Sequence, residues 1–375
     1  MLLVNMFVFG AYSDEWTGAL DRVCQVLKQS LFDTKSLRLF SMLFGFGFCL
    51  QLLKAEERGS PFLGFFIRRL AVLFVIGVGH SFFFDGDILM KYAALGLLLL
   101  VFRRVPPRLL LALAIVLMAV YPIGNAVVIA KGEPPPFDEA DLTLDERREG
   151  HPYLGSLTEV LAANTHAIPP RLFSKLHSPE SSLALLAMFL LGLYVGRRGI
   201  LRDIPGHRGL IRRWMIWGLS FGLGSSFVIQ ILIHGYDYQV FGAYGLPLGI
   251  QILGDTLFAY GSTALSIGYA GTIISLLETG RCAWLLRQFG NLGRMALTVY
   301  LSGTFLFTLL FYGYGFGQLF MLGPAATTGF AVLFFAMQIA FCAWWSRRYR
   351  FGPMEWLWRS ATYGRLQPNR LAAHT

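Results

Sequence analysis

Charged residues are scarce in this chain of 375 residues: they make up 14% of it, whereas hydrophobic residues make up 55%. Soluble domains carry roughly a quarter charged residues, so this balance excludes a cytosolic enzyme, a disordered chain and a small secreted module. Cysteine is also rare, and no pair has CxxC spacing; the four are Cys24, Cys49, Cys282 and Cys342. The sequence therefore favours neither a disulfide framework nor a metal site.

Long apolar runs dominate the rest of the sequence. A bilayer core about 30 Å thick requires roughly 20 apolar residues of helix, and nine runs meet or approach this length. We predict membrane helices at 36–53, 69–84, 88–102, 108–130, 182–197, 213–233, 250–277, 289–312 and 324–346. The predicted fold class is therefore all-α, a polytopic transmembrane bundle of about ten helices.

The tenth helix is a truncated apolar segment at 1–11. At 1.5 Å per residue it spans only about 16 Å, half of a bilayer. The segment is then either a half-helix shielded by its neighbours or the end of a helix that begins upstream of Met1, and we favour the second interpretation.

The net charge of +10 is distributed unevenly along the chain. The connections after the second, fourth, sixth and eighth helices, together with the C-terminal tail, contain 22 basic and only five acidic residues. Because cytoplasmic loops are enriched in Lys and Arg, this pattern predicts ten crossings with both termini in the cytoplasm. The basic charge then reflects membrane topology, and we expect the lipid bilayer, with no nucleic acid, as partner.

Four parts follow from this topology. Residues 1–130 form an N-terminal bundle of five helices, and 182–346 form a C-terminal bundle of five more. Between them, 131–181 is an external loop with nine acidic residues, which we expect to pack as short amphipathic helices over the outer mouth. The tail, 347–375, contains a predicted interfacial helix with Pro353 in its first turn and Gly364 after its end.

The run GVGHSFFFDGDILMKYA, residues 77–93, is the densest group of ionisable residues at membrane depth. Its candidate site residues are His80, Asp85, Asp87, Lys91 and Tyr92. His80 lies 11 residues beyond Arg69, about 16 Å along a helix, in the outer half of the bilayer. A histidine beside a carboxylate is the usual pair for general base catalysis.

Structural roles are open for the same residues. Asp87 stands where a helix N-cap belongs, and Lys91 follows at the spacing of an ion pair. His80 could simply bond a neighbouring helix, as polar side chains in membrane bundles often do.

Three further residues are candidates for substrate binding. Arg38 stands at the outer entrance of its helix, where it could bind an anion, pair with Asp85 or Asp33, or snorkel to the headgroups. Arg294 lies at the expected cytoplasmic start of helix 289–312, where free amides and a guanidinium favour an anion, although topology alone also places Arg there. Asp255, in a glycine-rich helix, is a candidate for an ion pathway.

Five motifs together resemble the bacterial inner-membrane family known as domain of unknown function 418, or YeiB-like proteins. They are LFSMLFGFGF, GHSFFFDGDILMKYA, ALLAMFLLGLYVGRRGIL, GRMALTVYL and FGPMEWLWRSATYGR. That family is distantly similar in helix order to membrane acyltransferases. This chain departs from the family pattern in lacking an Arg-Gly pair ahead of its first apolar run and in having Val299 where Asn is usual.

The resemblance implies a bacterial inner-membrane acyltransferase that takes an acyl group from a cytoplasmic thioester, such as acyl-coenzyme A, to a glycan or lipid acceptor. In this hypothesis His80 is the general base, Asp87 or Asp85 orients it, Arg38 steadies an anionic group, and Arg294 lies near the donor phosphates. Two alternatives remain open. One is a proton-coupled transporter of a small solute that uses His80, Asp87 and Asp255, and the other is a scaffold without chemistry.

Overall fold

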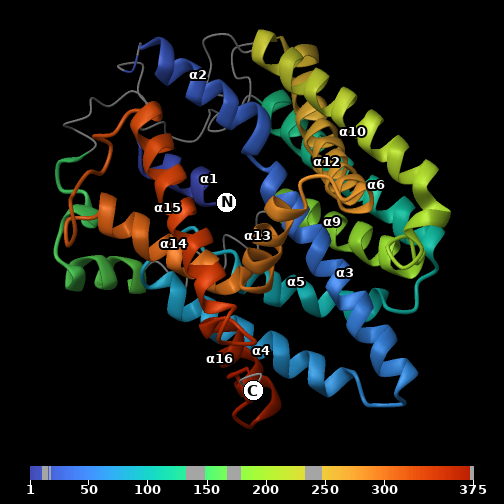
Figure 1. Ribbon diagram of the computed structural model, residues 1–375. Helices are drawn as coiled ribbons and strands as arrows, with labels where there is room; N and C mark the ends of the chain where they lie inside the picture. The colour runs from blue at the N-terminus through green and yellow to red at the C-terminus, as the bar shows by residue number, and fades with distance from the viewer. Residues whose placement is uncertain (11–15, 17, 132–147, 167–178, 233–246, 372–375) are drawn as a thin grey trace.

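Apolar runs of helical length determine the architecture of the chain (Figure 1). The computed structural model describes residues 1–10, 16, 18–131, 148–166, 179–232 and 247–371. Within these ranges the chain is helical, and its β-structure is a single bridge between Tyr349 and Arg370. The predicted all-α class is confirmed.

The helices are short at the N-terminus and longer through the remainder of the chain. Their bounds are α1 (Leu2–Phe9), α2 (Ala19–Leu27), the π-helix η1 (Lys28–Phe32), α3 (Lys35–Glu57), α4 (Leu63–Ser81), α5 (Leu89–Phe102), α6 (Pro107–Ala130), the 3-10 helix η3 (Pro152–Leu154), α9 (Pro179–Arg197), α10 (Ile204–Leu232), α12 (Leu248–Thr279), α13 (Ala283–Arg294), α14 (Ala296–Phe311), α15 (Pro324–Trp345) and α16 (Pro353–Tyr363). Every predicted apolar segment overlaps these helices, and the segment 289–312 is divided between two of them, α13 and α14.

Six helices of the described chain are long and apolar enough to cross a membrane, or seven if one bent pair counts as a single span. The bent pair corrects a prediction. The expected continuous helix 289–312 is broken at Met295, where α13 and α14 meet at 82°. Two other predicted spans, 88–102 and 182–197, correspond to helical stretches of at most 17 residues; α5, with 14 residues, extends only about 21 Å.

Glycines allow two helix pairs to approach closely. A Cβ on Gly45 of α3 would overlap the backbone of Phe189 in α9, and one on Gly192 of α9 would overlap Met42. Gly218 and Gly222 bring α10 against α12 in the same way. Small residues are the usual means by which membrane helices pack without a hydrophobic driving force.

The sequence Gly218-Leu-Ser-Phe-Gly222 matches the G-x-S-x-G pattern of serine hydrolases. In those enzymes the serine occupies a sharp strand-to-helix turn, whereas here it lies inside the uninterrupted α10. The two glycines pack on α12, so the pattern is structural.

The described part of the predicted external loop, 148–166, covers the end of the bundle that contains the α4–α5 turn. It comprises η3 and a helix over 157–166. Tyr153 stacks on Tyr312 with ring centroids 4.6 Å apart, and Asn164 donates to the carbonyl of Phe82 at 3.0 Å. Residues 132–147 and 167–178, the rest of that predicted domain, lie outside the described chain.

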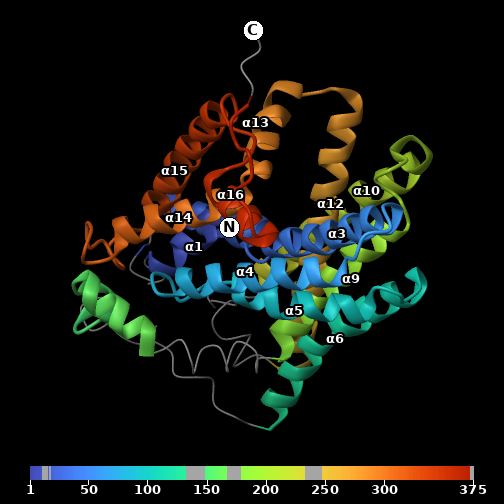
Figure 2. The same ribbon diagram turned by 90° about the horizontal axis from the view of Figure 1, so that it is seen from below.

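The predicted tail helix is present as α16, with Pro353 at its start and Gly364 at a φ of 66° after its end. It packs on α4: the indole of Trp358 donates to the carbonyl of Arg69 at 2.9 Å, and the Arg69 guanidinium lies 3.8 Å from the same ring. Figure 2 shows α16 close to α4 and α14. The tail helix therefore packs directly against α4 and α14 of the bundle.

Candidate functional site

His80 lies in the last turn of α4 and is 7% exposed. Its Nδ1 is 2.8 Å from Asp87 Oδ1, and its Nε2 is 2.8 Å from Thr304 Oγ1 of α14. The rings of Tyr300 and Phe84 lie against it, with centroids 5.0 and 5.7 Å away. The imidazole is thus held at both nitrogens inside the bundle.

Asp87 has both of the roles weighed from the sequence. One carboxylate oxygen contacts His80, and the other accepts from the backbone N–H of Met90 at 3.0 Å, in the first turn of α5. It is 2% exposed. Because a carboxylate only accepts, the proton on this side belongs to His80 Nδ1, and in the neutral form of the ring Nε2 is then an acceptor.

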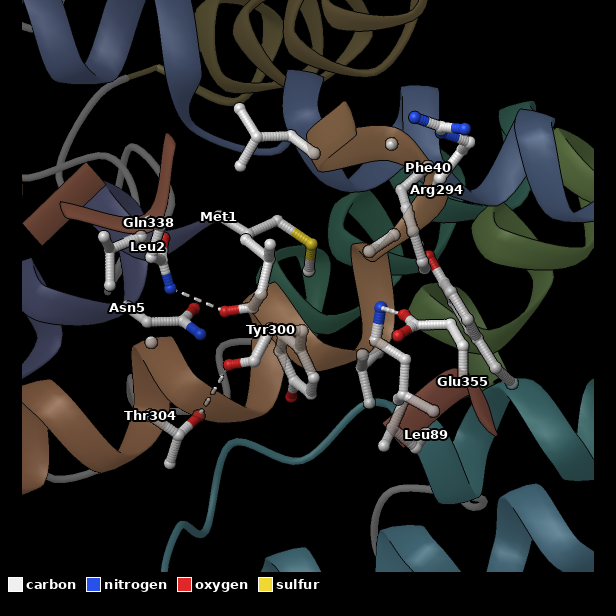
Figure 3. Close-up of a pocket in the computed structure, with 18 of the residues that line it drawn as sticks. Met1, Leu2, Asn5, Phe40, Leu89, Arg294, Tyr300, Thr304, Gln338 and Glu355 are labelled. Atoms are coloured by element: carbon white, nitrogen blue, oxygen red, sulfur yellow. Dashed lines mark hydrogen bonds between the residues drawn. The ribbon is translucent and has the colours of Figure 1, made fainter. Parts of the chain in front are cut away.

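Thr304 connects this pair to a pocket of about 450 Å³. Thr304 lines the pocket (Figure 3), whereas His80 is not among the lining residues and reaches the pocket through its contact with Thr304. The pocket wall is mostly apolar, and Figure 3 places Asn5, Gln338 and Thr304 on one side and Arg294 and Glu355 on the other. The imidazole is therefore one hydroxyl away from a space that can hold an apolar ligand.

Arg294 lies at the edge of this pocket, in the last turn of α13. The sequence prediction had placed it at a helix N-terminus, and this is wrong because the chain breaks at Met295. The N-terminus that follows belongs to α14, and its amides are already occupied: Glu355 of α16 accepts from Leu297 N at 2.6 Å and from Thr298 N at 3.1 Å. Arg294 itself is exposed and bonds Asn291 at 2.6 Å.

Arg38 contacts a neighbouring helix. Its guanidinium donates to the carbonyl of Ala259 and to Thr263 Oγ1, both in α12. It belongs to a group of buried charges at the junction of η1 and α3, in which Lys28 pairs with Asp33 at 3.0 Å. The Arg38 contacts join α3 to α12. His80 is instead held by Asp87 and by Thr304 of α14.

The remaining sequence candidates lie at separate places. Tyr92 lines the pocket, and its hydroxyl is 2.6 Å from Ser41 Oγ. Lys91, 8% exposed, lies beside it in α5, and Asp255, 2% exposed, lies in α12. Asp85 is half-buried in the α4–α5 turn. Of the two aspartates considered as His80 partners, Asp87 is the one at its Nδ1.

Sequence reasoning missed Thr304 and Glu355. Thr304 and Tyr300 share one face of α14 at i,i+4 spacing, but nothing local indicates that this face meets a histidine 224 residues earlier. Glu355 stands in the first turn of a helix, where an acidic residue usually interacts with its own helix.

The wider relationships of the chain agree with the motifs. A family model described as "Protein of unknown function (DUF418)" matches residues 195–365. The protein YxaH of Bacillus subtilis (strain 168) is 32% identical over 377 residues, which cover 95% of this chain and 86% of YxaH. The chain belongs to the DUF418 family.

Two other relatives extend over nearly the same length. The 39.9 kDa protein in the amylase 3' region of Bacillus acidopullulyticus is 28% identical and covers 98% of this DUF418 chain and 91% of its own. YeiB of Escherichia coli (strain K12) is 27% identical and covers 96% and 92%. No solved structure matches the chain. The names of these relatives state no activity. The long apolar helices of the chain are those of a membrane protein.

Proposed function

We propose that this DUF418 protein is a membrane acyltransferase, which moves an acyl group from a cytoplasmic thioester to a hydroxyl of a glycan or lipid. The observation that carries the proposal is the buried chain Asp87–His80–Thr304, with both joining distances at 2.8 Å, which ends at the wall of an apolar pocket.

The chain has the parts that general base catalysis requires. Asp87 fixes the tautomer of His80 and stabilises the imidazolium that forms when Nε2 takes a proton. Both residues are buried: His80 is 7% and Thr304 is 3% exposed. In such surroundings the carboxylate stabilises the charged ring more strongly than it would in water.

The pocket supports an acyl substrate. Its volume of about 450 Å³ lies in the range of small-molecule sites, and its walls include Leu73, Leu89, Leu297 and Phe307. Such an apolar wall can pack against a hydrocarbon chain, and it offers few hydrogen-bonding groups to a small hydrophilic solute.

The ends of the pocket fit the two parts of a thioester donor. Arg294 stands at one edge, where a guanidinium can bind donor phosphates of the coenzyme A type. Thr304 lies seven residues beyond Leu297, which is in the first turn of α14, and is therefore about 10 Å further along the helix axis from Arg294. Inner-membrane location and cytoplasmic termini belong to the proposal, because the basic loops and tail then face the thioester pool.

The test is consumption of acyl thioesters by the purified full-length protein in proteoliposomes. Acetyl, octanoyl and palmitoyl donors are supplied with membrane lipids and glycans as acceptors, and the released thiol is measured. We expect His80→Gln to lower the rate roughly 10²- to 10⁴-fold. His207→Gln is the matched control, since His207 contacts Asp203 at the start of α10, away from the pocket.

Three outcomes separate the hypotheses. Loss of activity in His80→Gln but not in His207→Gln supports the transferase. Equal thioester consumption in both variants contradicts the role of His80. Absence of any consumption, with a proton-linked solute flux that requires His80, would replace the transferase with a transporter.

A further inference from the structure

We propose that Thr304 is the nucleophile of this reaction and carries the acyl group as an ester between donor and acceptor. This inference rests on the proposed function and deepens it, since it assigns a covalent intermediate to a residue of α14. An acyltransferase could equally hold both substrates together and use His80 directly on the acceptor.

The hydrogen bonds of Thr304 support its activation. In the neutral imidazole, which is the form that acts as a base, Nδ1 donates to Asp87 and Nε2 accepts, so the Thr304 hydroxyl is the donor across the 2.8 Å contact. The competing acceptor is the carbonyl of Tyr300 at 3.4 Å, a much weaker contact. The hydroxyl proton therefore points at the base that would remove it, as in other hydroxyl nucleophiles.

The position of Thr304 supports the same role. Thr304 lines the pocket and His80 does not, so an acyl group in the pocket lies closer to Thr304 than to the imidazole, whose Nε2 is 2.8 Å from Thr304 Oγ1. An acceptor hydroxyl that used His80 directly would first have to displace Thr304 from Nε2.

Thr308, one turn further along α14, shows what an ordinary buried threonine does in this helix. It is 1% exposed, its hydroxyl donates to the carbonyl of Phe305 at 3.2 Å, and it does not line the pocket. Both threonines are buried in the same helix. Of the two, Thr304 alone contacts an imidazole and also lines the pocket.

The reaction has two balanced halves. In the first, Thr304 Oγ1 attacks the thioester carbonyl carbon as His80 Nε2 takes the hydroxyl proton; the C–S bond breaks, and the proton passes to the departing thiolate. In the second, an acceptor hydroxyl gives its proton to Nε2 and attacks the ester carbonyl. The C–O bond to Thr304 breaks, and Thr304 recovers a proton from His80.

The experiment uses the full-length protein and an acyl thioester without acceptor. After rapid acid quench, peptide mass spectrometry locates any acyl group. In parallel, exchange of isotope-labelled free thiol into the thioester is followed, because a covalent intermediate permits this exchange without acceptor. We expect an ester on Thr304, exchange in the wild type, and loss of exchange by at least about 10³-fold in Thr304→Val.

Controls keep folding apart from chemistry. Thr304→Ser retains a hydroxyl and should keep measurable exchange, and Thr308→Val should exchange like the wild type. If Thr304→Val fails to fold, the wild-type ester map and Thr304→Ser still decide the question.

The outcomes test the role of Thr304 separately from the acyltransferase activity. Thioester transfer to acceptor without exchange, or with the acyl group on another residue, overturns the role of Thr304 and leaves the acyltransferase intact. Absence of thioester consumption with every donor and acceptor overturns both.

Discussion

Glu355 is the residue whose removal gives the clearest stability prediction. Its carboxylate ties the tail helix α16 to the N-terminus of α14 by accepting from Leu297 N at 2.6 Å, Thr298 N at 3.1 Å and Thr298 Oγ1 at 2.6 Å. Glu355→Gln keeps the shape but removes the charge. The loss of charge from two backbone bonds costs about 1 kcal/mol each, and the helix dipole adds about 0.3–1 kcal/mol.

The expected total is about 2–3 kcal/mol, which lowers Tm by roughly 3–4 °C, because the entropy of unfolding of a chain of 375 residues is about 0.8 kcal/mol per kelvin. Intrinsic tryptophan fluorescence in detergent measures the transition. Glu57→Gln is the control, because Glu57 is 62% exposed and pairs with Arg202 at 3.5 Å, a contact worth at most about 1 kcal/mol. Equal Tm values for the two variants would refute the capping role of Glu355.

Two further stability predictions concern the bundle core. Gly45→Ala places a methyl group on the backbone of α9 and should cost about 1–3 kcal/mol or more. Gly47→Ala faces open space inside the same helix and should raise the stability by about 0.5–1 kcal/mol, since Ala favours a helix over Gly. A similar Tm for both variants would show that α3 and α9 do not pack as described. Lys28→Met leaves Asp33 buried without its ion pair at 3.0 Å and should cost roughly 3–5 kcal/mol. Adding Asp33→Leu should restore most of the lost Tm, and a double variant no more stable than the single one would contradict this account of the pair.

The sequence predicted the helices well because apolar length is a local property. Each predicted segment overlaps a helix, although 289–312 is divided between α13 and α14, and the tail helix begins at the predicted Pro353 and ends just before Gly364. The break at Met295 was missed, because the apolar pattern continues through it. What permits the bend is a tertiary contact, the cap that Glu355 supplies 58 residues later.

Of the candidate site, the pair His80 and Asp87 was predictable from the sequence, and its third member was not. His80 and Asp87 are seven residues apart, so a single turn between two helices brings them together, and their 2.8 Å contact could be anticipated. Thr304 could not, since an isolated threonine in an apolar helix has no distinguishing pattern. Arg38 illustrates the converse: its type and position predicted a ligand, but its guanidinium contacts lie in α12.

The most direct test of the account is an experimental structure in lipid with a non-hydrolysable thioether analogue of an acyl donor. We predict the acyl chain in the pocket lined by α14, its carbonyl beside Thr304 Oγ1 and the donor phosphates at Arg294. Binding in the apolar space between α3, α9, α10 and α12, which is about 360 Å³ in volume, with Thr304 still bonded to His80 and no acyl group near it, would contradict the central claim.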